Sequence, residues 1–203
     1  MTTDKAAQQQ NTLKRELLSA WQSFGDRYPD DDFYAFGLYT TDTASYCGAV
    51  ACSEQGLESA ADNYAEHYGS NFELHRQSLR WSIGDSPFFD EGLDMMPLTN
   101  ELRALEPDPY SDGDESEIEA SRERFFAAAF AAIKELDDEG ILGTGQARER
   151  VILSVWLHDE SHAMKLDAAA KLNCRPSVER YSAELEAGLD AFNKWRPIPQ
   201  SQR

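Results

Sequence analysis

Apolar residues occur in short dense segments that predict a small β-sheet. Residues 32–40 read DFYAFGLYT, and after a polar turn a second such segment covers residues 44–52. Aromatic and β-branched residues at this density favour strands, so the two segments predict an antiparallel hairpin. Residues 151–157, VILSVWL, form the most continuously apolar run and predict a central strand buried on both faces. In residues 74–82 apolar and polar positions alternate towards the end, which predicts another strand.

Apolar residues at helical spacing predict helices between these strands. Gly25, Gly69 and Gly140 are the expected stops of the first, second and fourth of them. The predicted helices cover residues 13–24, 53–68, 92–105, 116–139, 161–172 and 177–194. Residues 1–10 are polar and predict a disordered tail, and the proline-containing residues 106–119 predict an acidic loop. We therefore expect one domain over residues 1–203, of α+β (mixed α/β) class, with a mostly antiparallel sheet of about four strands and helices packed on it.

Charge narrows the class of partner. The chain has 37 acidic and 19 basic residues, a formal net charge of -18. Residues 26–119 contain 22 of the acidic and only 4 of the basic residues, so the excess lies in that segment. Such a chain is repelled by phosphate backbones, which argues against nucleic acid as its partner, and it is suited to a basic protein. The alternative is that the charge serves solubility or adaptation to salt.

Cysteine content and the N-terminus indicate a compartment. The three cysteines, Cys47, Cys52 and Cys174, cannot all pair and show no metal-type CxxC spacing, which fits a reduced environment. The first residues lack the order of a signal peptide, and no apolar run approaches the length of a membrane span. These features predict a cytoplasmic protein without a membrane partner, and they leave the oligomeric state open.

One histidine pair could bind a metal. His158 and His162 are four residues apart, the spacing at which two imidazoles on one helical face grip a divalent ion. In the zincin pattern a glutamate follows the first histidine, whereas Asp159 stands here. The alternative is a polar loop before the next helix. No nucleophile motif or phosphate loop is present, so we expect no catalytic residue, metal or cofactor.

An aromatic and acidic loop gives the candidate contact residues. Aromatic side chains with neighbouring arginine and carboxylates are typical of protein interfaces, although a tryptophan at a strand end can equally fill the core. The predicted partner-binding residues are Trp81, Phe88, Phe89, Asp90, Glu91, Asp108, Asp112, Asp114, Glu115 and Glu117.

Three segments carry a family resemblance. They are DFYAFGLYT at residues 32–40, LRWS at residues 79–82 with the loop ending in Asp90 and Glu91, and VWLHD at residues 155–159. In this order they resemble the bacterial domain-of-unknown-function family 4303 over about residues 13–175. The resemblance transfers no active site, but small acidic domains of this kind are often encoded beside toxins as immunity proteins. We therefore expect an immunity-type protein that occludes a basic toxin surface, the alternative being a metal-assisted hydrolase that uses His158, Asp159 and His162.

Overall fold

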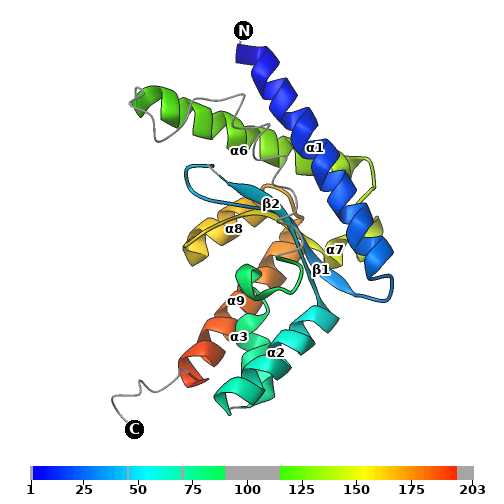
Figure 1. The fold of residues 1–203 in the computed structure, drawn as a ribbon, viewed down its shortest axis with the longest axis vertical. Coiled ribbons are helices and arrows are strands. Elements are labelled where there is room, and N and C mark those ends of the chain that lie inside the picture. The colour runs from blue at the N-terminus through cyan, green and yellow to red at the C-terminus, as the bar shows by residue number, and fades with distance from the viewer. Residues whose placement is uncertain (1, 45, 70, 90–114, 196–203) are drawn as a thin grey trace.

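A computed structural model describes residues 2–44, 46–69, 71–89 and 115–195 (Figure 1). Its elements are, in chain order, α1 (Thr2–Arg27), β1 (Phe33–Thr40), β2 (Cys47–Ser53), α2 (Glu54–Tyr68), α3 (Phe72–Leu79), the short 3-10 helix η1 (Ile83–Asp85), α6 (Glu115–Asp138), α7 (Gly145–Arg150), β3 (Ile152–Leu157), α8 (His162–Ala170) and α9 (Arg175–Trp195). The α+β class is confirmed. The predicted helix at residues 92–105 and residues 106–114 of the predicted acidic loop lie outside the described residues. Residues 115–119, predicted as the end of that loop, are instead the first residues of α6.

The sheet is smaller than expected and is mixed. The three described strands lie in the order β2-β1-β3, with β1 antiparallel to β2 and parallel to β3. The predicted hairpin is confirmed. The prediction that residues 151–157 form the central strand is wrong, because β1 occupies the middle and β3 lies at an edge. β3 is nevertheless buried over most of its length, because helices cover both faces of the sheet: Leu153 and Val155 point to one face, and Ile152 and Trp156 point to the other.

The predicted strand at residues 74–82 is a helix, α3. Asn71 caps its N-terminus, because the side-chain oxygen accepts a hydrogen bond from the amide of Glu73 at 2.8 Å. His75 and Leu79, one helical turn apart, are its buried residues. The cap and this spacing outweigh the alternation at the end of the segment, which explains why the sheet has one strand fewer than predicted.

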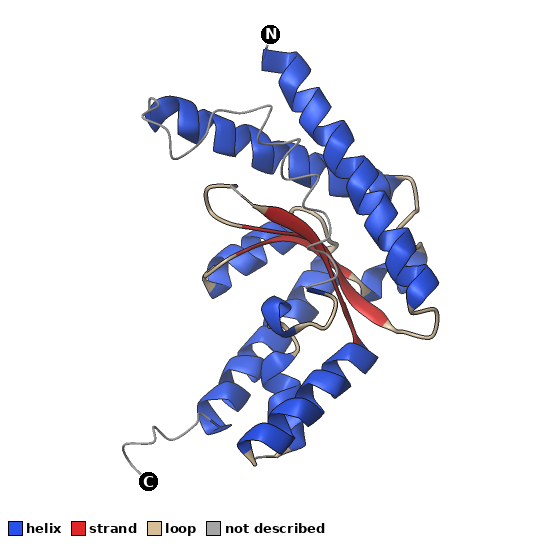
Figure 2. Ribbon diagram, viewed as in Figure 1, coloured by secondary structure: helices blue, strands red, loops and turns tan. Residues whose placement is uncertain are grey.

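Helices cover both faces of the sheet (Figure 2). Alternate residues of β1 point to opposite faces, so Phe36 and Leu38 pack with α1 and α6 while Ala35 packs with the helices on the other side. One core therefore lies between the sheet and the pair α1 and α6, and the second lies among the sheet, α2, α3, α8 and α9. The largest fully buried side chains come from both: Trp156, Tyr181, Phe36, Leu13, Leu17, Leu38, Ile133, Leu136, Leu142, Ile152 and Leu153.

The first helix begins earlier and ends later than predicted. It starts at Thr2, whereas the sequence predicts a disordered tail over residues 1–10, and it continues through Gly25 to Arg27. Polar residues in the first half of α1 pack on α6. Gln9 is buried, and Gln10 and Lys14 both donate to Glu135, at 3.1 and 2.7 Å. Polar side chains thus make tertiary contacts that an apolar pattern does not reveal.

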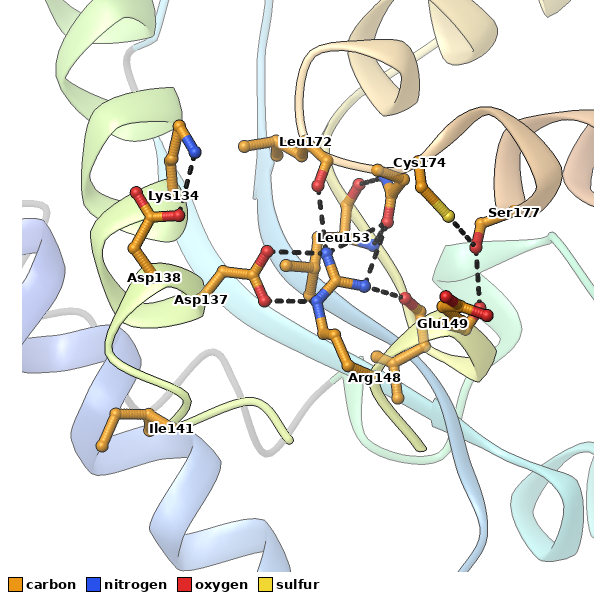
Figure 3. A network of polar contacts seen from close by, with 12 residues as sticks. Lys134, Asp137, Asp138, Ile141, Arg148, Glu149, Leu153, Leu172, Cys174 and Ser177 are labelled. Atoms are coloured by element: carbon orange, nitrogen blue, oxygen red, sulfur yellow. Dashed lines mark hydrogen bonds and ion pairs between the residues drawn. The ribbon is translucent and has the colours of Figure 1, made fainter. Parts of the chain in front are cut away.

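Arg148 of α7 links α6 to the residues just before β3 and just after α8 (Figure 3). Its guanidinium pairs with the Asp137 carboxylate of α6 and donates to the backbone oxygens of Val151 and Leu172, at 2.7 and 3.0 Å. Beside it, Asn173 binds the edge of β3: its Oδ1 accepts from the Leu153 amide at 3.0 Å, and its Nδ2 donates to the Leu153 carbonyl at 2.7 Å. These contacts fix β3 relative to α6 and α8.

Candidate partner-binding site

The predicted aromatic contact residues are mostly core residues. Trp81 is 5% exposed, and its indole nitrogen donates to the Glu184 carboxylate at 3.1 Å. Phe88 is 3% exposed and packs edge-on against Phe24, with ring centroids 5.7 Å apart. Phe89 is half-buried. The alternative in which the tryptophan fills the core therefore describes Trp81, and neither Trp81 nor Phe88 offers its ring to a partner in this structure.

The predicted acidic contact residues divide into two groups. Asp90, Glu91, Asp108, Asp112 and Asp114 lie outside the described residues. Glu115 and Glu117 are exposed in the first turn of α6. Their carboxylates face solvent near the positive end of the helix dipole.

Arg80, next to Trp81, has a structural role. Its guanidinium pairs with Glu54 at 2.6 Å and with Glu184 at 3.0 Å, so it links α3 to α2 and α9. It also lies 4.3 Å from the centroid of the Tyr34 ring. Burial alone would raise the pKa of Glu54, but the hydrogen bonds and charges of Arg80 and Arg76 lower it. The two arginines of this region are thus occupied within the molecule.

An acidic surface lies on α2, where sequence analysis placed no contact residue. Glu58, Asp62 and Glu66 recur every four residues and are exposed, and the helix contains no lysine or arginine. The loop before β1 lies against the first turn of this helix: the Glu54 amide donates to the Asp32 carbonyl at 3.0 Å, and the Gln55 side chain donates to the Asp30 carbonyl at 3.1 Å. We define the acidic face by its exposed carboxylates, Asp30, Asp32, Glu58, Asp62 and Glu66. The four-residue spacing of acids without an intervening base was the signal that could have located it.

A groove lies between α6 and α8 at the β3 edge of the sheet, whereas α2 follows β2, the strand at the other edge. It encloses about 500 Å³, and β3 forms its floor with Val155 and Leu157. Apolar and charged side chains form its walls: Glu119, Arg122, Glu123, Phe126, Ala127, Phe130, Glu160, Met164, Asp167, Ala168 and Lys171. An apolar base with a charged rim is the usual composition of a binding groove.

Glu160 is one of the residues that line this groove. It follows β3 after a turn at Asp159, whose φ of 58° is left-handed. Burial raises the pKa of Glu160 to about 7, although a backbone hydrogen bond with Leu157 and the charge of Lys165 act in the opposite direction. The same carboxyl group also lines a second pocket of about 320 Å³ between α3, α8 and α9.

Replacing Glu160 by glutamine is expected to stabilise the protein at alkaline pH. Because the folded state raises this pKa from 4.5 to about 7, ionised Glu160 disfavours folding, and stability is lost as the pH rises through this window. Allowing for solvent screening at this partly exposed group, we expect Glu160→Gln to unfold with a free energy about 1–2 kcal/mol higher than the natural protein at pH 8. The difference should shrink towards pH 5.

Urea unfolding between pH 5 and pH 8 measures this difference. The exposed Glu186 provides the matched control, because Glu186→Gln makes the same chemical change at a solvent-facing position and should not reproduce the gain in stability at pH 8. A difference between Glu160→Gln and the natural protein that does not vary with pH would contradict the expectation.

The histidine pair does not share a helical face. His158 lies in the turn after β3, with Nδ1 2.7 Å from the Tyr39 hydroxyl, whereas His162 is the first residue of α8. The left-handed Asp159 turns the chain between them. Within the described part of the chain no three His, Cys, Asp or Glu side chains gather as a metal site would require. The alternative of a polar loop before the next helix fits this geometry, because Ser161 caps α8.

The cysteine thiols of β2 are buried. Cys47 and Cys52 are 2% and 4% exposed, and burial raises the pKa of Cys52 to about 12. A thiol with this pKa is protonated and unreactive at neutral pH. No described helix is both long enough and apolar enough to cross a membrane.

Over its described residues, the chain therefore has a mixed α+β fold with a three-stranded sheet, helices on both faces, an acidic face and an apolar groove. The chain belongs to the family described as Domain of unknown function (DUF4303), whose model matches residues 13–174. The match covers β1, β2, β3 and α8 and ends just before α9. Searches of curated proteins and of solved structures returned no match.

Proposed function

We propose that this protein is an immunity-type binding protein of the cytoplasm, which neutralises a toxin domain by covering a basic surface on it. The observation that carries the proposal is the acidic face, where Glu58, Asp62 and Glu66 are exposed along a helix without a basic residue. The nearby Arg76 and Arg80 pair with Glu54, and so do not neutralise these carboxylates. A field of one sign accelerates the encounter with an oppositely charged protein.

The size of α2 suits such a role. A helix of 15 residues is about 22 Å long, and a standard interface hides about 800 Å² on each partner. The loop before β1, which contains Asp30 and Asp32, lies against the first turn of α2 and extends the acidic face beyond the helix. Charged contacts at the rim of an interface act mainly on the association rate, so binding should weaken as salt rises.

Reversing charge on α2 is expected to weaken partner binding. The partner is first isolated by affinity purification from the native cell and identified by mass spectrometry. Glu58→Lys with Asp62→Lys should then lower its affinity about tenfold to hundredfold at low salt, mainly through slower association. Surface plasmon resonance at two salt concentrations measures both the rate and its salt dependence.

A matched pair on α9 controls for net charge. Glu186 and Asp190 are also exposed and four residues apart, so Glu186→Lys with Asp190→Lys makes the same chemical change elsewhere. This control should reduce the affinity much less. Equal losses from the two pairs, or tight binding without any salt dependence, would refute the proposal.

The alternative of a metal-assisted hydrolase has less geometric support, because His158 and His162 do not lie on one helix. Elemental analysis of the purified protein separates the two functions. Stoichiometric zinc or manganese that is lost in His162→Ala would favour the hydrolase.

A further inference from the structure

We propose that the groove between α6 and α8 receives an amphipathic, basic helix of the partner protein. This inference rests on the proposed function and names the part of the partner that the groove recognises. It concerns a surface at the β3 edge of the sheet, and no residue of α2 lines it, so the two surfaces can be tested separately.

The two walls of the groove are formed by rows of side chains on α6 and α8. On α6 the lining residues Glu119, Glu123, Phe126 and Phe130 recur at three- and four-residue intervals, and they form a second face beside the one that packs on the core. Residues 119–130 rise about 16 Å, or three helical turns. A bound helix places anchors at positions i, i+4 and i+7 over about two turns, so a groove of this length can hold all three.

The opposite wall has the same character. On α8 and its C-terminal cap residue, the lining residues also recur at helical spacing: Met164, Asp167, Ala168 and Lys171. Met164 is 43% exposed, a high value for a large apolar side chain, and its flexible thioether can adapt to a bound apolar residue. With the floor of β3, the walls offer an apolar channel suited to the apolar face of a helix.

The charged residues at the rim of the groove favour a basic helix. The two cations of the rim are already engaged: Arg122 pairs with Glu119 at 3.1 Å, and Lys171 lies 4.5 Å from the centroid of the Phe130 ring. Within the described residues, Glu123 and Asp167 form no ion pair. The rim therefore presents unpaired carboxylates on both walls, Glu123 on α6 and Asp167 on α8. Lysine or arginine residues flanking the apolar face of a helix would meet these carboxylates on either side.

Two peptides of identical composition test the inference. The first is an 18-residue helix with leucines on one face and lysines on the other, and the second is a scrambled sequence that removes the apolar face. At physiological salt the full-length protein should bind the amphipathic peptide at least about tenfold more tightly, because each large apolar side chain that becomes buried contributes about a factor of ten. Fluorescence anisotropy measures both affinities.

Blocking variants locate the binding site. Ala127 is an exposed residue of the α6 wall, and Ala127→Arg places both bulk and positive charge in the groove. It should abolish the preference for the amphipathic peptide, and Met164→Arg on the opposite wall should do the same. Ala187→Arg on the exposed face of α9 is the matched control and should retain the preference. Circular dichroism verifies that each variant is folded.

The outcomes separate the two proposals. Equal binding of the two peptides, or an undiminished preference in both groove variants, would overturn the groove inference. If the lysine pair on α2 weakens the native partner while Ala127→Arg and Met164→Arg do not, the proposed function stands and the groove inference fails. If the groove variants remove the peptide preference while the α2 pair leaves partner binding unchanged, the groove inference stands and the acidic face is not the docking surface.

Discussion

Gly37→Ala is expected to unfold the protein or to destabilise it by more than about 4 kcal/mol. Gly37 lies in the middle of β1, opposite Ser154 of β3. A Cβ atom at this position would lie 1.9 Å from the Ser154 carbonyl oxygen and 2.9 Å from the Trp156 ring. The backbone of β1 or β3 cannot move away from this contact without breaking the parallel pairing of the two strands. Both cores pack against these strands.

Gly25→Ala provides the comparison. Gly25 lies within α1, and nothing would contact a Cβ atom there within 4 Å. Alanine in a helix interior is favoured over glycine by about 1 kcal/mol, so this variant should be unchanged or slightly more stable. Urea unfolding followed by tryptophan fluorescence compares the two. A folded Gly37→Ala protein with an unchanged midpoint would show that β1 and β3 do not pair as described.

Arg148→Met is expected to cost about 3–5 kcal/mol, because it removes one partner from a mostly buried ion pair. The side chain of Arg148 is 13% exposed and that of Asp137 is 22% exposed. The substitution leaves the Asp137 carboxylate without its cation and the carbonyls of Val151 and Leu172 without a donor (Figure 3). Arg148→Lys should rescue little, since an ammonium group cannot reproduce the planar fork that reaches all three partners.

Arg150 supplies the control on the same helix. It is exposed, and Arg150→Met should change the free energy of unfolding by less than about 0.5 kcal/mol. Thermal and chemical unfolding of both variants measure the difference. Similar small effects at the two positions would mean that the Arg148 contacts do not hold β3 against α6.

Much of the fold follows from local patterns. The hairpin, the helices α2, α6, α8 and α9 and the apolar strand β3 lie close to their predicted ranges, because caps and apolar spacing are local signals. The Ser53 side chain caps α2, and Gly69 ends it with a φ of 64°. Patterns of this kind do not state which strands are neighbours.

The wrong predictions for β3, Trp81 and Phe88 have a common cause: the sequence does not show which part of the chain will cover a given residue. A continuous apolar run predicts a central strand, yet β3 lies at an edge, and its side chains are apolar because helices cover both faces of the sheet there. Trp81 and Phe88 stand near a polar loop but fill the core, because the chain folds back over them. Sequence alone indicates the size and polarity of a side chain and does not indicate what will cover it.

The candidate site was only partly within reach of sequence analysis. The excess of acid over residues 26–119 pointed to the segment that carries the acidic face, and the spacing of Glu58, Asp62 and Glu66 could have placed it on one side of a helix. The groove could not be found in this way. It arises where α6 and α8, from distant parts of the chain, meet over β3, and only the tertiary arrangement brings their rows of side chains together.

The side chain of Asn173 also limits how other chains can approach. By bonding to both the amide and the carbonyl of Leu153, it takes the place that a neighbouring strand would fill. Exposed strand edges are the usual templates for sheet extension between molecules, in aggregation as well as in peptide capture. Neither a second copy of this chain nor an extended peptide can lengthen the sheet at that point unless it first displaces the asparagine.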